Sequence, residues 1–336
     1  MDIEALSIRI SWIGFFLTLV INSTVLHTAF HHSNNIFGSY KYLIMSFSLM
    51  GIIFATAEIF SKPMIFDVDS AFIILTFLKP ARSWKSFILL AMFASMFAVT
   101  IHLLTIQFVY RYWAIFKIQN VKKYFGKLKC VFLWFTTCAF VFLCMSLMLY
   151  IARPDTVSDE FLQNRTKSNL SLNPELMTYY IAMIYLEGSF NYIESFPLLV
   201  VIIMVAAHYI IISYCGFQMF KNMNKKMISL SNHLQRINKQ LFRTLIIQVC
   251  LPTLFIFTPM LSIYIIPFFN LDLFINAGPI ACSLSFYPSI DGLICLYFIV
   301  DYRNALKADI LYFLNCLTCR TKSAEPKSPK PPNEKY

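Results

Sequence analysis

The sequence predicts an all-α integral membrane protein, built as a seven-transmembrane helix bundle with its N-terminus outside. Three observations carry this prediction. The 336-residue chain is 58% hydrophobic and only 13% charged, so it has more apolar surface than one soluble core can bury. Seven apolar segments are long enough to cross a bilayer as helices. Basic residues gather in alternate connections between these segments, which is the pattern of membrane orientation.

The spans follow one another without an internal repeat. They are predicted at Ile10 to Phe30, Tyr42 to Phe60, Phe87 to Tyr110, Cys130 to Ile151, Pro197 to Phe217, Leu245 to Phe268 and Leu273 to Val300. The first is expected to be retained, because acidic residues and no basic region precede it. Two further apolar runs, Ala71 to Leu78 and Met177 to Tyr185, are too short to cross and are expected to be loop or interfacial segments.

The orientation follows from charge. Of the 28 Lys and Arg residues, 20 lie in the connections after spans one, three and five and in the C-terminal tail. The positive-inside rule therefore places the tail in the cytoplasm. Glycosylation sequons at Asn164 and Asn169 lie in the long loop 152–196, which would be extracellular. The net charge of +11 does not indicate nucleic-acid binding, because no single domain collects the basic residues.

The remaining segments flank this bundle of residues 10–300. Residues 1–9 are expected to be an extracellular N-terminus. Residues 301–319 are expected to form an amphipathic juxtamembrane helix, with Leu306, Ile310, Leu311 and Leu314 on one face. Cys316 and Cys319 at its end are candidates for palmitoylation, the alternative being unmodified thiols. The Pro-rich, charged residues 320–336 are expected to be a disordered cytoplasmic tail.

No enzyme, metal or cofactor motif is recognised. Nine cysteines are present and none falls in a predicted extracellular loop, so we expect no structural disulfide. The chain shows no zinc-ligand spacing, Walker loop or G-x-S-x-G motif, and we expect neither catalysis nor a cofactor.

Polar groups within spans are costly and tend to face the bundle interior. For Asn22, His102 and Gln248 we favour hydrogen bonds between helices over contact with a ligand. Asp291 follows Pro288 in span seven and is predicted either to take part in a conformational switch or to be structural. Pro252 and Pro259 are candidate hinge residues in span six. Glu58, near the outer end of span two, either lines a ligand pocket or reaches the lipid headgroups.

Several sequence segments, in matching order and spacing, resemble one receptor family. They are "GSYKYLIMSFS" (Gly38 to Ser48), "FVYRY" (Phe108 to Tyr112), "YCG" (Tyr214 to Gly216), "LQRINKQLFRTLIIQVCLPTLFIFTP" (Leu234 to Pro259) and "YPSIDGLICLYFIVDYR" (Tyr287 to Arg303). As a set they are similar to the nematode serpentine chemoreceptors of the Str class, within the rhodopsin-like G-protein-coupled receptor superfamily. Gly292 departs from the pattern, since the family usually has Pro after the span-seven Asp.

The resemblance implies a chemosensory receptor in the plasma membrane, expected in the sensory cilium of a neuron. It would relay an odorant or another small environmental cue to a heterotrimeric G protein. Because the outer halves of spans three, five, six and seven are rich in Phe, Leu, Met and Ile, we expect the cue to bind there and to be mostly apolar. The resemblance implies that Arg111, which lies between Tyr110 and Tyr112, is a coupling residue. From the basic inner face we add Lys117, Lys239 and Arg243 as coupling candidates. The candidate switch and hinge residues, chosen from the prolines and polar groups within the spans, are Gln248, Pro252, Pro259, Tyr287, Pro288 and Asp291. The basic inner face is also suited to anionic membrane lipid.

Two alternative functions are less consistent with the sequence. A ligand-gated channel of the insect odorant-receptor kind has seven spans in the opposite orientation, which would put both sequons in the cytoplasm and reverse the charge rule. A small transporter usually shows repeated halves and broken helices. The receptor interpretation is therefore favoured.

Overall fold

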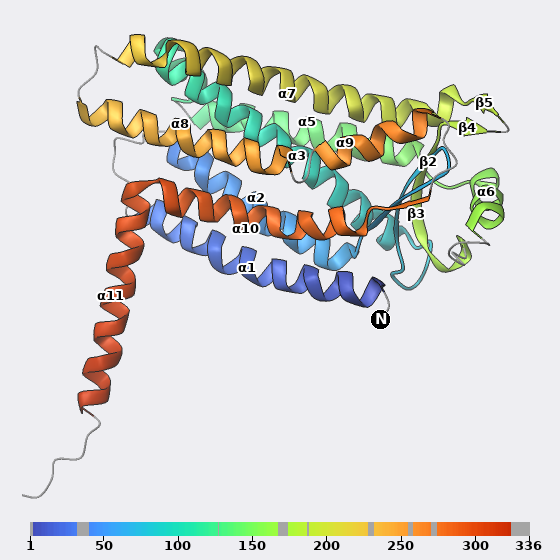
Figure 1. Cartoon of the computed structure of the whole chain (residues 1–336), viewed down its shortest axis with the longest axis horizontal. Coiled ribbons are helices and arrows are strands. Elements are labelled where there is room, and N and C mark those ends of the chain that lie inside the picture. The colour runs from blue at the N-terminus through green and yellow to red at the C-terminus, as the bar shows by residue number, and fades with distance from the viewer. Residues whose placement is uncertain are drawn as a thin grey trace, which may run out of the picture.

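The computed structural model describes residues 3–31, 40–126, 128–166, 174–186, 188–227, 232–254, 258–269 and 274–323. Within these ranges the chain is mostly helical, and long helices run side by side along the molecule (Figure 1). A small sheet lies across one end of the helices, and the C-terminal helix leaves from the other end. We refer to these as the cap end and the opposite end.

Five long helices correspond to the first five predicted spans. They are α1 (Ile3–His31), α2 (Tyr40–Ser61), α3 (Trp84–Phe116), α5 (Leu128–Ile151) and α7 (Tyr192–Met227). Each is long and apolar enough to cross a membrane. Because α3 packs against α2, α5 and α7, it is the central helix of the bundle. A short helix, α4 (Ile118–Tyr124), follows it.

The last two predicted spans are less regular. The sixth comprises α8 (Asn232–Pro252), α9 (Thr258–Ile265) and the 3-10 turn η4 (Ile266–Phe269), and the seventh is α10 (Gly278–Phe298). Between α10 and α11 (Val300–Ser323) the chain bends by 92°, where Ile299 adopts an extended backbone. Counting that bent pair as one span, up to six spans in the described part of the chain qualify by length and composition. The interrupted sixth predicted span is the one that does not qualify, so the total of seven stays a prediction.

The predicted ends of the bundle also differ from the helices observed. Helix α1 begins at Ile3, so most of the predicted N-terminal segment 1–9 is helical. Helix α11 continues to Ser323, a few residues into the predicted disordered tail. Both helices therefore extend beyond the apolar runs from which the boundaries were predicted.

The two short apolar runs lie in connections between the predicted spans, but they form strands instead of irregular loops, so the all-α prediction was wrong about this sheet. Strands β1 (Met64–Val68), β2 (Ala71–Thr76), β3 (Thr178–Met183) and β6 (Phe274–Asn276) form an antiparallel sheet in the order β3-β2-β1-β6. Such runs are too short to span a membrane, but β-branched and aromatic residues suit strands that are buried on both faces.

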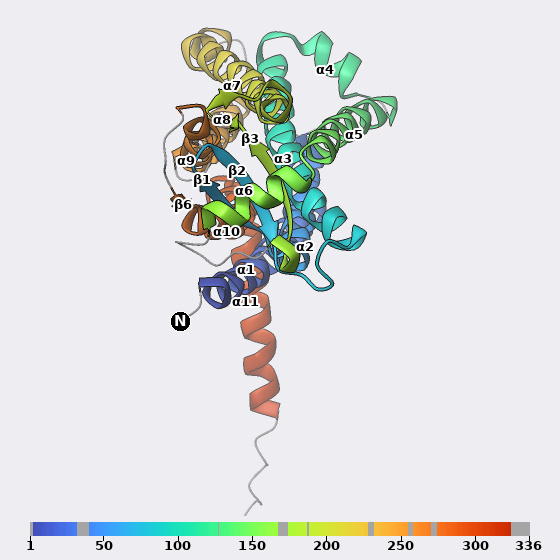
Figure 2. The same cartoon turned by 90° about the vertical axis from the view of Figure 1, so that its right-hand side faces the viewer.

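Each face of the sheet packs against a different layer. Side chains alternate along a strand, so Ile65, Ile74 and Tyr180 join the core of the helix bundle. Phe66 and Tyr179 point the other way and pack around Leu162 of α6 (Thr156–Thr166), which lies over the sheet (Figure 2). We call these four strands together with α6 the cap. The 3-10 turn η2 (Pro174–Leu176) and a small hairpin of β4 (Tyr185–Leu186) and β5 (Ser189–Phe190) complete this end.

The cap is built from the connections after spans two, four and six. Strands β1 and β2 come from the first of these and meet in a two-residue turn, in which Asp69 has a φ of 52°, a conformation that Asp tolerates. Strand β3 comes from the second connection and β6 from the third. These three connections therefore lie at the same end of the bundle, as alternating spans require.

Candidate functional site

An apolar chamber lies directly beneath the cap. It consists of two adjoining cavities of about 40 Å³ each, which share the walls formed by Phe72, Ile74, Met145, Leu149 and Tyr264. One cavity extends toward Leu198 and Val201 of α7. The other reaches α3, α9 and α10, where its lining residues are Phe93, Phe97, Met260 and Leu284. The chamber thus lies among the helix ends where the sequence predicted a small apolar ligand.

Glu58 lies in the wall of a separate cavity of about 150 Å³ at the cap end. Its side chain is buried, and Oε1 accepts a hydrogen bond of 2.9 Å from the hydroxyl of Ser11. The hydroxyl of Ser285 donates a second hydrogen bond to the same oxygen. The carboxyl group of Glu58, on α2, therefore links α1 to α10.

A second buried acid, Asp67 of β1, was missed by the sequence analysis. Its side chain is 0% exposed, and neither carboxyl oxygen has a hydrogen-bond partner among the residues that the structure describes. Burial raises the pKa of this carboxyl to about 8. Asp67 pairs with Phe72 in the β1–β2 register, so both side chains are on the face toward the chamber. A single acid in the apolar run Met64–Val68 was the available signal.

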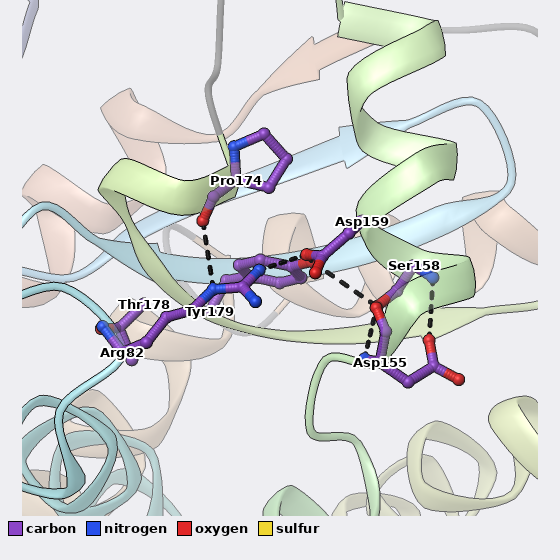
Figure 3. Close-up of polar contacts among 7 residues, drawn as sticks. All are labelled: Arg82, Asp155, Ser158, Asp159, Pro174, Thr178 and Tyr179. Atoms are coloured by element: carbon purple, nitrogen blue, oxygen red, sulfur yellow. Dashed lines mark hydrogen bonds and ion pairs between the residues drawn. The ribbon is translucent and has the colours of Figure 1, made fainter.

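The outer face of the cap carries a network centred on Asp159 (Figure 3). The guanidinium of Arg82 and the hydroxyl of Tyr179 both donate to Asp159 Oδ1, and Arg82 Nε donates to the carbonyl of Pro174 at 3.3 Å. Burial by itself would raise the pKa of Asp159, but the hydrogen bonds from Arg82 and Tyr179 outweigh it and lower this pKa. The network ties α6 to β3 and to the connection before α3.

The first turn of α6 is capped within the chain. Asp155 Oδ1 accepts a 2.8 Å hydrogen bond from the backbone N–H of Ser158, and Ser158 Oγ accepts one of 2.8 Å from the backbone N–H of Asp155. This reciprocal pair satisfies donors that a helix start leaves free. Near the other end of α6, the sequon residue Asn164 is exposed, whereas Asn169 falls outside the described residues.

Two predicted switch residues contact each other inside the bundle. The side-chain amide of Gln248 on α8 donates to Asp291 Oδ1 at 2.9 Å and Oδ2 at 3.0 Å on α10, and it also lies 3.3 Å from Cys295 Sγ. All three side chains are buried. A hydrogen-bonded link therefore joins the helices of the sixth and seventh predicted spans.

The part of α10 around Pro288 packs against α1 and α2. Asn22 donates a 3.0 Å hydrogen bond to the carbonyl of Pro288, and a Cβ on Gly51 would lie 3.0 Å from the Pro288 ring. A Cβ on Gly292 would lie 2.8 Å from Ile21. Glycine at 292 thus permits the close approach of α1 to α10.

The other predicted hinge and structural residues take these places. Tyr287 is buried on α10. Pro252 ends α8 and Pro259 lies in the first turn of α9, on either side of residues 255–257, which fall outside the described ranges. His102 on α3 and His208 on α7 are linked by a 3.0 Å hydrogen bond between Nδ1 and Nε2, so His102 does join two helices.

The predicted coupling residues lie at the opposite end and divide into buried and exposed groups. Arg111 is 6% exposed, and its guanidinium lies over the ring of Tyr40, which is stacked on Tyr110. Tyr112 is partly buried, with its ring centroid 6.0 Å from that of Tyr214 on α7. The exposed group consists of Lys117, Lys239 and Arg243.

Helix α11 leaves the bundle at the same end (Figure 1). Ile310 and Leu311 are exposed on it, so the described part of the chain leaves these two apolar side chains uncovered. Cys316 and Cys319 lie on its last turns, but their side chains fall outside the described residues.

Comparisons with known proteins give consistent matches over almost the whole chain. The family model described as serpentine type 7TM GPCR chemoreceptor Str matches residues 7–307. The chain is similar to G-protein coupled receptor str-33 of Caenorhabditis elegans, with 29% identity and 91% of each chain covered. It is also similar to serpentine receptor class r-10 of C. elegans, with 28% identity over 88% of each chain, and to its namesake in C. briggsae, with 26% identity over 88% of this chain and 87% of the other.

Proposed function

Because the chain belongs to the Str family of serpentine seven-transmembrane chemoreceptors, we propose that it binds a small chemical cue beneath the cap and activates a heterotrimeric G protein at the opposite end. The family is one of multi-pass membrane receptors and not of enzymes. One observation carries the proposal. An apolar chamber lies at one end of the bundle, and a buried arginine, Arg111, lies at the other end together with the exposed residues Lys117, Lys239 and Arg243.

The orientation proposed for the plasma membrane has the cap outside and α11 inside. The basic connections at the opposite end support it through the positive-inside rule, and the sequons in the connection that forms α6 and β3 support it independently. In this orientation α11, bent by 92° from α10, would lie on the inner leaflet with Ile310 and Leu311 in the lipid.

The ligand is proposed to be small and mostly apolar. The chamber is lined by aromatic and aliphatic side chains, and burial of apolar ligand surface there would contribute about 25 cal/mol per Å². Its two cavities of about 40 Å³ are narrow, so binding would require the cap or the adjoining helix ends to move apart. That movement is the proposed first step of signalling.

The signal is proposed to cross the bundle through α8 and α10. The bond between Gln248 and Asp291 links these helices at the level where Pro288 interrupts the backbone hydrogen bonding of α10. If a ligand displaced Leu284 in the chamber wall, the same helix would also displace Asp291. The hydrogen bond from Gln248 would pass this displacement on to α8. Movement of α8 would open the bundle next to Arg111.

The experiment is to substitute Arg111 in receptor-expressing cells stimulated with an odorant panel. Arg111→Lys and Arg111→Ala are expected to reach the surface and to lose most agonist-driven G-protein activation, because docking a partner needs the planar, multidentate guanidinium. Lys85→Ala, which removes an exposed cation at the cap end, serves as the control and should signal normally. Full signalling by Arg111→Lys would show that the guanidinium is not required and would overturn this assignment.

A further inference from the structure

We infer that Asp67 is a recognition residue for the ammonium group of a small, mostly apolar amine, which binds in the chamber with its nitrogen toward β1. The inference deepens the proposed function and rests on it, because it names the chemical class of ligand for the same chamber. It follows from the position of this acid, its lack of a partner and the kind of side chains around it.

The position is set by the register of the cap. On β1, Ile65 and Asp67 are two residues apart and so face the same side of the sheet, and Ile65 lines the chamber. Across the β1–β2 pair, Phe72 stands opposite Asp67 and lines both cavities. Opposed side chains on one face have Cβ atoms about 4.5–5.5 Å apart. The carboxyl group is therefore on the face of the sheet that covers the chamber, next to two residues that line it.

The carboxyl group lacks the partners that buried acids usually have. Asp67 is 0% exposed, and both oxygens are without a hydrogen-bond donor in the described part of the chain. Glu58, the other buried acid at this end, shows the contrast, since hydroxyl groups from two helices donate to it. A buried carboxylate without a cation is costly, so a cation supplied from outside would be bound strongly.

The surroundings suit an organic cation. Tyr264 of α9 lies close enough to Asp67 for the two groups to interact electrostatically, and its ring packs edge-on against Phe72 with centroids 4.9 Å apart. Phe93 and Phe97 complete an aromatic wall in the same cavity. An acid beside aromatic faces offers an ammonium group an ion pair and cation–π contacts at once, while the apolar remainder of the molecule fills the chamber.

The pH dependence of binding gives a second readout. Strands β2 and β6 carry no titratable residue, Tyr264 is the titratable neighbour on α9, and Tyr287 of α10 interacts instead with Asp291 and Tyr209. Since the pKa of Asp67 is about 8 in the free protein, binding an ammonium ion below that pH must release one proton. Amine affinity should therefore rise about tenfold per pH unit up to about pH 8 and then level off.

The test uses the purified full chain in lipid nanodiscs and four matched pairs of probes. These are benzylamine, phenethylamine, hexylamine and cyclohexylamine, each compared with the alcohol of the same skeleton. We expect at least one amine to bind more tightly than its alcohol, and Asp67→Asn to weaken that amine roughly 30-fold or more while changing the alcohol about twofold at most. Asp69→Asn, in the adjacent turn, removes the same charge and tolerates the same backbone, and should bind as the unaltered protein does.

The outcomes separate this inference from the proposed function. If no amine exceeds its alcohol, or if Asp67→Asn binds the best amine normally, the inference is wrong. If Asp67→Asn weakens the binding of amine and alcohol equally, Asp67 forms a hydrogen bond to a neutral group, and the inference is also wrong. Thermal unfolding of each variant without probe shows whether it is folded. Asp67-dependent amine binding without any G-protein activation in cells would uphold the inference and refute the coupling function.

Discussion

The guanidinium carbon of Arg111 lies 3.3 Å from the centroid of the Tyr40 ring, so the end of α3 is held against the start of α2. Nε and Nη2 of Arg111 have no hydrogen-bond partner among the described residues. The aromatic face therefore compensates in part for the buried cation, beside a polar contact between the guanidinium and the Tyr40 side chain. In this conformation the guanidinium is not available to a partner at the surface, so the proposed coupling role would require its release from Tyr40.

Removal of the Tyr40 ring should therefore raise signalling without ligand. A cation–π contact contributes roughly 0.5–2 kcal/mol, so Tyr40→Leu is expected to increase the population with Arg111 released by about 2- to 30-fold. The measurement is basal G-protein activity at equal surface expression. Tyr40→Phe keeps the ring and should stay near the basal level of the unaltered receptor. If Leu and Phe behave alike, the contact does not restrain Arg111.

A second prediction concerns the packing of α1 on α10. A Cβ at Gly14 would lie 2.6 Å from the backbone oxygen of Ser285, which cannot move without shifting α10. Gly14→Ala should lower the thermal unfolding midpoint and the surface yield, since overpacking usually costs about 1–3 kcal/mol. At Gly216 the added Cβ would meet only Phe108, at an ordinary 3.5 Å. Gly216→Ala is the matched control and should be tolerated; equal loss in both variants would refute the packing argument.

Apolar length predicted the helices well and the cap poorly. The helices of the first five spans were found because a run of about 20 apolar residues is rare outside membrane-spanning helices. The strands of the cap were missed because a run such as Ala71–Thr76 has the same pattern whether it is loop, interface or strand until its partner is known. Pairing β2 with β3 joins residues about 100 positions apart, which no local pattern encodes.

The same limit applies to the site residues. Gln248 and Asp291 were predicted because ionisable and amide groups within apolar spans are conspicuous, and their contact follows from the neighbouring helices. Asp67 carries the same signal, one acid in an apolar run, but it lay in a predicted loop, where an acid is unremarkable. The partner of Arg111 was also missed, because Tyr40 is 71 positions away and an aromatic residue near a span end is common at a membrane interface.

The orientation of the cap leads to a third prediction. Asn164 is exposed on α6, on the side of the cap away from the bundle. If the cap is extracellular, glycosidase treatment should increase gel mobility, and Asn164→Gln combined with Asn169→Gln should abolish the shift. An epitope tag inserted after Asn164 should be stained on intact cells. Staining only after permeabilisation, with the protein at the surface, would reverse the topology.

The fourth prediction is that acid loosens α6 from the cap. The pKa of Asp159 is lowered by its bonds with Arg82 and Tyr179, so its stabilising contribution is complete above the ordinary Asp pKa of about 4 and is lost as pH falls through the lowered value. Hydrogen exchange of the α6 amides should therefore accelerate, relative to α5, below about pH 4. Asp159→Asn should show faster α6 exchange at neutral pH and little further change on acidification. Unchanged protection in that variant would mean that Leu162 alone holds the helix.

The last prediction is that ionisation of Asp67 destabilises the folded protein, whereas ionised Asp159 stabilises it. The folded-state pKa of Asp67, about 8, lies above the usual Asp value. At low pH the carboxyl is neutral in both the folded and the unfolded chain, so its ionisation does not lower the free energy of unfolding there. As pH rises from about 4 to 8, the unfolded chain ionises first and the folded protein is progressively destabilised. Asp67→Asn, which stays neutral, should match the unaltered protein in thermal unfolding near pH 4 and unfold at a higher temperature near pH 8. A gain of stability combined with a loss of amine binding is expected of a buried acid retained for its ligand. If the unfolding midpoint of Asp67→Asn falls at pH 8, the carboxylate is instead stabilised by the protein, and the site as described here is wrong.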